Sequence, residues 1–460
     1  MHRSKLHKWI PQLGLHSYPH SVATTWLMSF QVVRTRNPPG AELFQLLAFL
    51  NPDGVRVDFL QAGAEALGDQ KKDVRQLLSN QIEMAKALLE LGSFSLLKWD
   101  RTAKTLLVHR LVQAVVKDEM SDIELTTFRI TVIDLCCGAF PDDWDSFEGR
   151  VACRNCVGQV MTPLLDAGVA HTKKAALIMS NVGLFLGEDG KFKDSQQLLT
   201  SGLEISSQIY GQDHSKTLRL MGDLAVSYWR QGKTGEAATL LEEVVQKEKH
   251  ILGDNDPETL TRMCNLAVMY LDLGKIKEAA VLQEEALQKK MQILAHNHPA
   301  TLTSMHVLAL IYKEQGKMGE AATLQEAVCK KRKQILGDDH PDTLASLNNL
   351  ASTYHDQGKL EEARALQEEI LQKTEQLLGN IHPSTLTSMS NLALTKFHQG
   401  KLEEARALQE EIFQKSTQTD SGRETPRDTV KNGRPYIHIL ASREDGSSHH
   451  ASEATGQVER

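Results

Sequence analysis

The sequence lacks the features that would place the protein in a membrane or outside the cell. No apolar run reaches the roughly 18 residues that a membrane-spanning helix needs. Residues 1–14 are basic but carry no apolar stretch of the kind found in secretory signals. The six cysteines among 460 residues are too few and too unevenly placed for a disulfide framework. These absences predict a cytoplasmic protein in a reducing compartment, with no membrane partner.

The chain also lacks a surplus of positive charge. Its net charge is −7 and its pI is near 6.2, with 52 Lys and Arg residues interspersed among 59 Asp and Glu residues. Proteins that bind nucleic acid or anionic membranes gather their basic residues into patches. The sequence therefore predicts no nucleic-acid partner.

Motifs of the common enzyme classes are missing as well. There is no G-x-x-x-x-G-K-[ST], G-x-S-x-G or H-E-x-x-H motif and no glycine-rich dinucleotide loop. Cys136-Cys137 and Cys153-x-x-Cys156 are a possible zinc set, but an adjacent pair chelates poorly and zinc sites usually combine two tight motifs. We expect these cysteines to be buried in helices. The prediction is a protein that is not an enzyme and has no metal or resident cofactor.

What the sequence does contain is a repeat. Thr217-Leu218 and Thr259-Leu260 are 42 positions apart (259 − 217 = 42), and a turn glycine keeps the same interval from Gly190 to Gly400. Later copies of the Thr-Leu pair start at Thr301, Thr343 and Thr385. Self-similarity at a fixed period predicts a solenoid. A stack of similar units offers an extended surface, which favours binding over catalysis.

Residues 341–379 show the repeat unit most clearly. Pro341 begins a helix whose apolar residues fall at helical spacing up to Tyr354, and Gly358 breaks it. A second apolar stripe follows from Leu360 to Leu371. Each unit is therefore predicted to be an antiparallel helix pair that buries its stripes by stacking.

Small and aromatic residues recur within this unit. Ala351, Tyr354 and Ala363 have counterparts 42 residues earlier in three preceding copies. This pattern resembles the tetratricopeptide repeat. The long period and the L-G-(D/N)-x-H-P-x-T-L linker resemble the subtype found in kinesin light chains and in fungal signalling ATPases. One recurring position departs from that family, with glutamine in place of a large apolar residue: Gln283, Gln325 and Gln367.

The resemblance to kinesin light chains implies a ligand site. It implies that asparagines on the first helix of each pair form hydrogen bonds with the backbone of an extended peptide, since an amide offers both a donor and an acceptor. The matching row would line a concave groove, with an apolar pocket where valine interrupts it. The alternative is that these residues form a polar face open to solvent. The row comprises Asn181, Asp223, Asn265, Val307, Asn349 and Asn391.

Residues 20–120 do not repeat and predict a different domain. A polar tip at 99–104 lies between the apolar stretches Phe94–Leu97 and Leu106–Val108, which predicts a β-hairpin. Helical segments precede the hairpin, and a further helix follows from His109. This order is typical of a winged helix. Because no basic recognition helix is evident, DNA binding is not expected.

A second resemblance covers this domain. T-T-W-L-M-S-F at 24–30, P-P-G-A-E-L-F-Q-L-L-A-F-L at 38–50 and L-L-V-H-R-L-V-Q at 106–113 resemble the arm that follows the nucleotide-binding core in fungal NB-ARC (STAND) signalling ATPases. The resemblance implies that His109 contacts the β-phosphate of ADP; the other reading of His109 is local packing. Because the phosphate-binding loop is absent, ADP or ATP would be a cofactor only if an upstream nucleotide-binding domain exists.

Together these observations predict a mostly α protein: a winged-helix-like domain followed by an α-solenoid of about six helix pairs. The leading hypothesis is a non-enzymatic protein-interaction scaffold or sensor that binds a peptide or partner domain in the groove. The alternatives are a kinesin-light-chain-like cargo adaptor, whose N-terminal coiled coil is not evident, and a fragment of an NB-ARC-type regulatory ATPase. The sequence does not decide the oligomeric state. The predicted segments are an extension at 1–19, the winged helix at 20–120, a helical linker at 121–172, the repeats at 173–416 and a disordered tail at 417–460.

Overall fold

The computed structural model describes residues 22–143, 147–166 and 168–420 of the chain. The predicted extension at 1–19 lies outside the described residues, as does the tail predicted at 417–460 except for residues 417–420, which belong to helix α20 (Leu402–Asp420). The chain divides into two compact units, residues 1–220 and residues 221–460.

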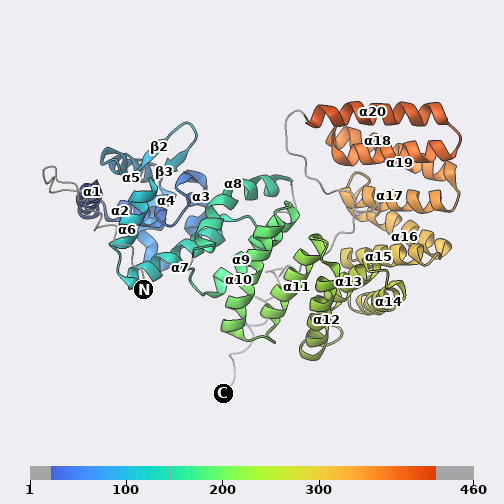
Figure 1. Cartoon of the computed structure of the whole chain (residues 1–460), viewed down its shortest axis with the longest axis horizontal. Coiled ribbons are helices and arrows are strands. Elements are labelled where there is room, and N and C mark those ends of the chain that lie inside the picture. Colours follow the sequence, from blue (N-terminus) through green and yellow to red (C-terminus); the bar gives the residue numbers. More distant parts are fainter. Residues whose placement is uncertain (1–21, 144–146, 167, 421–460) are drawn as a thin grey trace, which may run out of the picture. The chain divides into compact units, whose positions relative to one another are not determined.

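The first unit begins with a winged helix, as predicted (Figure 1). Strand β3 (Thr105–Leu107) lies between β1 (Asp53–Arg56) and β2 (Lys98–Asp100) and is antiparallel to both. A strand that follows the first helices, then further helices, and then a hairpin make up the winged-helix order. The helices of this part are α1 (Val22–Arg36), α2 (Pro38–Leu47), α3 (Val57–Gly63), two short 3-10 turns (Ala64–Ala66 and Asp69–Lys71), α4 (Lys72–Ser79), α5 (Gln81–Ser93) and α6 (Arg110–Asp118).

The hairpin lies slightly later than the sequence predicted. Helix α5 continues to Ser93, and Ser95 turns the chain with a positive φ of 56°, so Phe94–Leu97 is not a strand. Behind the sheet, the buried Gln113 side chain of α6 donates hydrogen bonds of 2.9 Å to the carbonyls of Leu47 and Leu50. These bonds satisfy carbonyls that the end of α2 leaves open.

Four longer helices complete the first unit. They are α7 (Asp122–Ala139), α8 (Phe147–Leu164), α9 (Lys173–Glu188) and α10 (Phe192–Tyr210). A capping box of Ser121 and Glu124 begins α7. Phe140, which ends α7, meets Phe185 of α9 edge-on at 5.9 Å between ring centroids. The pair α9–α10 is the first helix pair of the repeat pattern.

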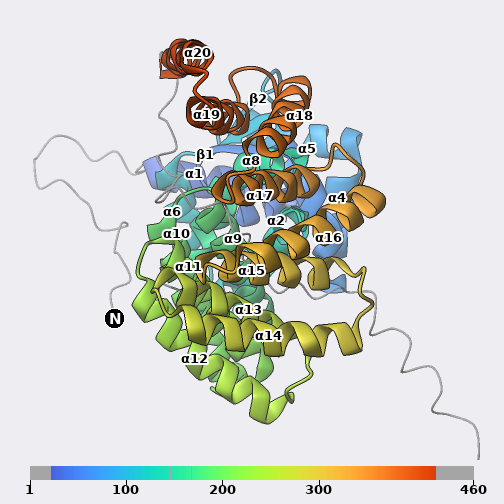
Figure 2. The same cartoon turned by 90° about the vertical axis from the view of Figure 1, so that its right-hand side faces the viewer.

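The second unit continues the repeats as a stack of antiparallel pairs, which rises from α12 to α20 in Figure 2. Buried leucines of each first helix pack between the second helix before it and its own, as around Leu347 and Ile370. Within the described residues, six pairs run from α9 to α20, in agreement with the predicted number. The later helices are α11 (Ser215–Arg230), α12 (Thr234–Ile251), α13 (Pro257–Asp272), α14 (Ile276–Ile293), α15 (Pro299–Glu314), α16 (Met318–Leu336), α17 (Pro341–Asp356), α18 (Leu360–Leu378), α19 (Pro383–His398) and α20 (Leu402–Asp420).

The recurring residues hold each pair in the way their chemistry predicts. Gly358 takes a φ of +76°, which lets the Lys359 amide close the helix end on the Tyr354 carbonyl at 2.9 Å. The histidine or aspartate before the helix-starting proline of a repeat is an N-cap, as when His340 Nδ1 accepts from the Asp342 amide at 3.1 Å. Ala351 is fully buried, so the helices approach closely there.

Candidate ligand-binding face of the repeats

Consecutive first helices are joined to each other by side chains 43 positions apart. Asn349 Nδ2 on α17 donates to His306 Nε2 on α15 at 2.9 Å. Asn391 Nδ2 on α19 donates to the side-chain oxygen Oδ1 of Asn348 on α17, also at 2.9 Å. The first helices α13, α15, α17 and α19 therefore form one continuous surface, which we call the first-helix face.

A second series of contacts with the same spacing runs nearer the C-terminal ends of these helices. Trp229 Nε1 donates to Asp272 at 2.7 Å. Lys313 Nζ lies 2.6 Å from Asp356, and His355 Nε2 lies 2.6 Å from His398 Nδ1. An indole, an ion pair and an imidazole pair thus take the same place at three junctions of the stack, whereas the equivalent residues at the α13–α15 junction are Leu271 and Glu314. This part of the first-helix face therefore varies in chemistry along the stack.

The structure places the predicted asparagine row between the first helices. Asp223 is buried, 3.4 Å from Arg262, and Asn265, Val307 and Asn349 are also buried. Asn391 is half-buried and bonded as above, and Asn181 is half-buried on α9 of the first unit. Where hydrogen bonds are seen, these side chains tie one helix to the next. Their role as direct ligand contacts stays a prediction.

The exposed part of the face lies beside that row, at positions the sequence reasoning did not select. Leu394 and Phe397 of α19 are 50% and 55% exposed, and His398 beside them is also exposed. Ser352 and His355 of α17 are half-buried. The repeat gave no signal for them, because Leu310 and Val268, the equivalents of Leu394 two and three repeats earlier, are buried. An apolar patch with polar neighbours is typical of an interaction site.

His306 marks where this face closes. Its side chain is 7% exposed, and burial lowers the pKa of His306 to about 4, with the positive charge of Arg332 acting in the same direction. The imidazole is therefore neutral at pH 7. Its Nε2 accepts from Asn349, while its buried Nδ1 has no hydrogen-bond partner. Leu310 is buried as well, so the face is more open at α17 and α19.

A buried polar contact also joins a second helix to the next first helix at the α14–α15 and α16–α17 junctions. Lys290 Nζ donates to Ser304 Oγ at 3.1 Å, and Arg332 Nη1 donates to Ser346 Oγ at 2.7 Å. One repeat earlier, Glu248 stands at the position of Lys290, and Arg262 stands at the position of Ser304. Arg262 Nε lies 3.9 Å from the Glu248 carboxylate. Burial raises the pKa of Glu248 to about 7, against the opposing effect of Arg262.

The cysteines of α7 and α8 are not arranged as a metal site. Cys136, Cys153 and Cys156 are buried, and burial raises the pKa of the Cys153 and Cys156 thiols to about 12. Thiols in this state are poor metal ligands and poor nucleophiles. Across the ranges that the structure describes, no group of three or more His, Cys, Asp or Glu side chains is placed to hold a metal ion.

His109 is exposed at the start of α6. Its Nδ1 accepts from the Leu111 amide at 3.2 Å, and its ring lies 6.1 Å from that of Trp26. The side chain thus caps a helix. A contact of His109 with a nucleotide from another domain stays a prediction.

Comparison with known families decides the class of the repeats. Tetratricopeptide-repeat models match residues 174–247, 259–300, 301–342, 330–376 and 342–415. The chain is a tetratricopeptide-repeat protein. Residues 32–125, which include the winged helix, match a domain of unknown function. No curated protein matches the chain.

Solved structures similar to the chain include other repeat proteins. A putative kinesin light chain from Podospora anserina with nearly identical repeats is 33% identical, covering 45% of this chain and 97% of that one, with a TM-score of 0.41 to 0.42 depending on the structure. A STAND signal-transduction ATPase with a tetratricopeptide-repeat sensor from Pyrococcus horikoshii is 13% identical, covering 88% of this chain and 67% of that one, with a TM-score of 0.42. The quorum sensor NprR in complex with its cognate peptide NprX is 19% identical, covering 60% and 75%, with a TM-score of 0.41.

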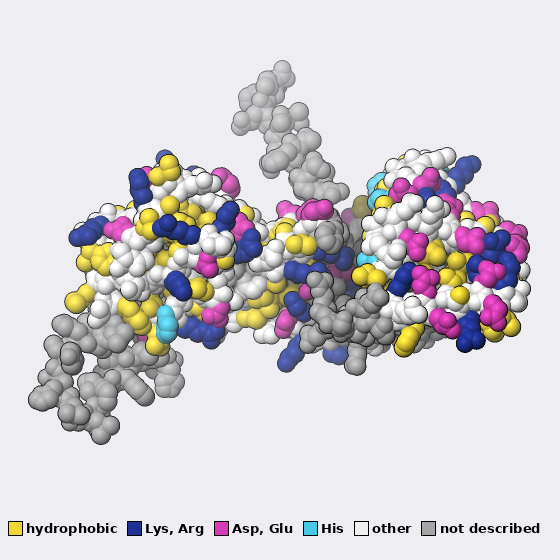
Figure 3. All heavy atoms as spheres, turned by 90° about the horizontal axis from the view of Figure 1, so that it is seen from above, with side chains coloured by type: hydrophobic (Ala, Val, Ile, Leu, Met, Phe, Trp, Pro, Cys, Tyr) yellow, Lys and Arg dark blue, Asp and Glu magenta, His cyan; other side chains and the backbone are white. Residues whose placement is uncertain are grey.

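The surface agrees with the charge pattern of the sequence. Figure 3 shows acidic and basic side chains interspersed over the repeats in the face that it displays. No helix in the described part of the chain is long and apolar enough to cross a bilayer.

Proposed function

We propose that this tetratricopeptide-repeat protein is a non-enzymatic scaffold that binds a peptide or a segment of a partner protein on the first-helix face. The observation that supports this most is the exposed apolar pair Leu394 and Phe397 next to His398, His355 and Ser352. Burying the exposed half of each apolar side chain under a partner would contribute about 1 kcal/mol each. The imidazoles and the hydroxyl supply hydrogen bonds that orient the bound segment.

The buried row has a supporting part in this proposal. Asn349 and Asn391 hold neighbouring first helices at a fixed spacing, and the residues next to them meet the ligand. Alanine at Asn349 would leave a buried acceptor on His306 unpaired and would destabilise the stack. Exposed residues therefore make the cleaner test of binding.

The proposal is tested by selecting peptides from a displayed library on the full chain. Leu394→Ser combined with Phe397→Ser should weaken the binding of at least one group of the selected peptides at least tenfold. Phe413→Ser on α20 is the matched control, because Phe413 is 70% exposed on the same last pair but on a second helix. The first-helix face is refuted as a site if every selected peptide binds the wild type and the double variant equally.

A further inference from the structure

The same ion pair joins consecutive second helices at two junctions of the stack and is missing from the junction between them. Lys249 Nζ of α12 lies 3.2 Å from Glu285 of α14, and Lys333 Nζ of α16 lies 3.1 Å from Glu369 of α18. Between these two junctions the equivalent residues are Met291 (249 + 42) and Ala327 (285 + 42). Of these three junctions, only the one between α14 and α16 has apolar residues in place of both members of the ion pair.

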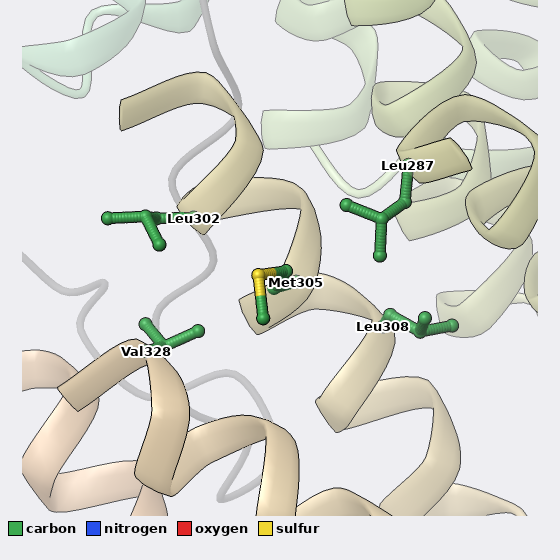
Figure 4. Close-up of a cluster of buried hydrophobic side chains, with 5 residues drawn as sticks. All are labelled: Leu287, Leu302, Met305, Leu308 and Val328. Carbon is green, nitrogen blue, oxygen red and sulfur yellow. The ribbon is translucent and has the colours of Figure 1, made fainter. Parts of the chain in front are cut away.

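A hollow lies beside Met291 of α14 and Leu308 of α15. A cavity of about 400 Å³ lies there. Beneath it is a core cluster drawn from α14, α15 and α16, which Figure 4 shows around Met305. Met291 and Ala327 pack against this cluster and are partly buried. The cavity is lined by Glu284, Leu287, Gln288, Met291, Gln292, His296 and Leu308; we call it the Met291 pocket.

The apolar character extends along α14 beyond the pocket. Val281 is 67% exposed and precedes Glu284 and Gln288 at helical spacing on the same side of the helix. The equivalent residues in the neighbouring repeats are Thr239 and Thr323 (281 − 42 and 281 + 42), which are polar. A valine exposed to water beside an apolar hollow gains stability only when something covers it.

We propose that the Met291 pocket receives one large aliphatic or aromatic side chain of a partner protein segment that carries a Lys or Arg next to it. The pocket volume lies within the range of ligand sites, and its open form suits a side chain better than a whole small molecule. Glu284 is the one carboxylate among the lining residues, and the Tyr312 hydroxyl holds it in place at 2.9 Å. A basic residue of the partner would pair with it.

Two glutamines that line the pocket favour a peptide segment as its ligand. Gln288 and Gln292 lie one turn apart on α14 and are exposed. Their amides carry both donors and acceptors, which match the backbone of an extended segment. The partner therefore contributes one apolar anchor, a basic neighbour and its own main chain. This site lies on second helices and does not depend on the first-helix face.

The chain itself provides the variant that closes the pocket. Met291→Lys with Ala327→Glu restores the ion pair seen at both neighbouring junctions, so the fold should be retained, with a melting temperature close to that of the wild type. The probe is a displayed peptide library selected on the full wild-type chain. We expect a group of selected peptides that share a large apolar residue beside Lys or Arg and that bind the pocket variant at least tenfold more weakly.

Two further variants make the outcome decisive. These peptides should bind the Leu394→Ser, Phe397→Ser variant as well as the wild type. Glu284→Gln, which keeps an acceptor for Tyr312, should weaken them severalfold, and this loss should fade at high salt. The proposal is overturned if no selected peptide distinguishes the wild type from the restored ion pair. The proposal is also overturned if the peptides that bind the wild type more tightly than the pocket variant lack a large apolar residue.

Discussion

The side-chain amide of Asn349 donates a 2.9 Å hydrogen bond to Nε2 of His306 across two consecutive first helices. One repeat later, Asn391 makes the equivalent bond to Asn348. The same junction is thus made once with a neutral, buried imidazole and once with an amide. This difference gives one repeat a sensitivity to acid that the next one does not share.

His306→Asn should make the protein more resistant to acid. In the wild type, unfolded His306 binds a proton near pH 6.5 and folded His306 only near pH 4, so stability falls as the pH drops through this interval. The asparagine of the variant still offers a hydrogen-bond partner to Asn349. Because it does not titrate, the variant does not lose stability over this pH interval. Thermal unfolding should show a difference within about 1 kcal/mol at pH 7.5 and a gain of roughly 1–3 kcal/mol for the variant at pH 4.5. Parallel plots of stability against pH for the wild type and the variant would contradict the lowered pKa of His306.

Glu248→Gln should stabilise the second unit at neutral and higher pH. The folded pKa of Glu248 is raised to about 7, so the folded chain binds more protons than the unfolded chain between about pH 4.5 and 7. Stability therefore falls as the pH rises through that interval. We expect the variant to be more stable by about 1–3 kcal/mol at pH 8 and no more stable at pH 4.5.

A matched control for Glu248 is Glu243→Gln. Glu243 lies on the same helix, half exposed, in an ion pair with Lys247. Its replacement should change stability by less than about 0.5 kcal/mol at either pH. If Glu248→Gln destabilises the protein at pH 8, the carboxylate is needed by Arg262 even though Asp223 and Glu258 lie 3.4 Å from it.

Ala351→Leu should destabilise the stack by about 1–3 kcal/mol, because three added carbons have no room at a fully buried position between helices. Ala345→Leu on the same helix is the control. Ala345 is exposed, so its replacement should have little effect. Chemical denaturation of the two variants measures both. Equal midpoints would mean that the helices do not meet at Ala351.

Much of the repeat architecture could be predicted because it depends on local chemistry. Glycine permits the positive φ at the helix ends, and histidine or aspartate before proline caps the next helix. From the sequence alone, the recurring glutamine is only a departure from the family pattern, which has a large apolar residue at this position. In the structure, the buried Gln283 donates to the Ser304 carbonyl at 2.8 Å, so it links one second helix to the following first helix.

The exposed part of the first-helix face could not be predicted from periodicity. The repeat shows that Asn348 and Asn349 occupy neighbouring positions, but their burial depends on how the adjacent helix lies against them. Asn349 is covered by α15, whereas Asn348 stays half-buried. In the same way, the Met291 pocket depends on two replacements 36 positions apart, on α14 and α16 (327 − 291 = 36).

Site-specific photo-crosslinking of a selected peptide tests the central claim most directly. A photoreactive amino acid is placed either at Ser352, on the first-helix face, or at Ala365, which is exposed on the second helix α18. Binding on the first-helix face predicts a covalent adduct with the peptide from position 352 and none from position 365. An adduct from position 365 with none from position 352 would contradict the account.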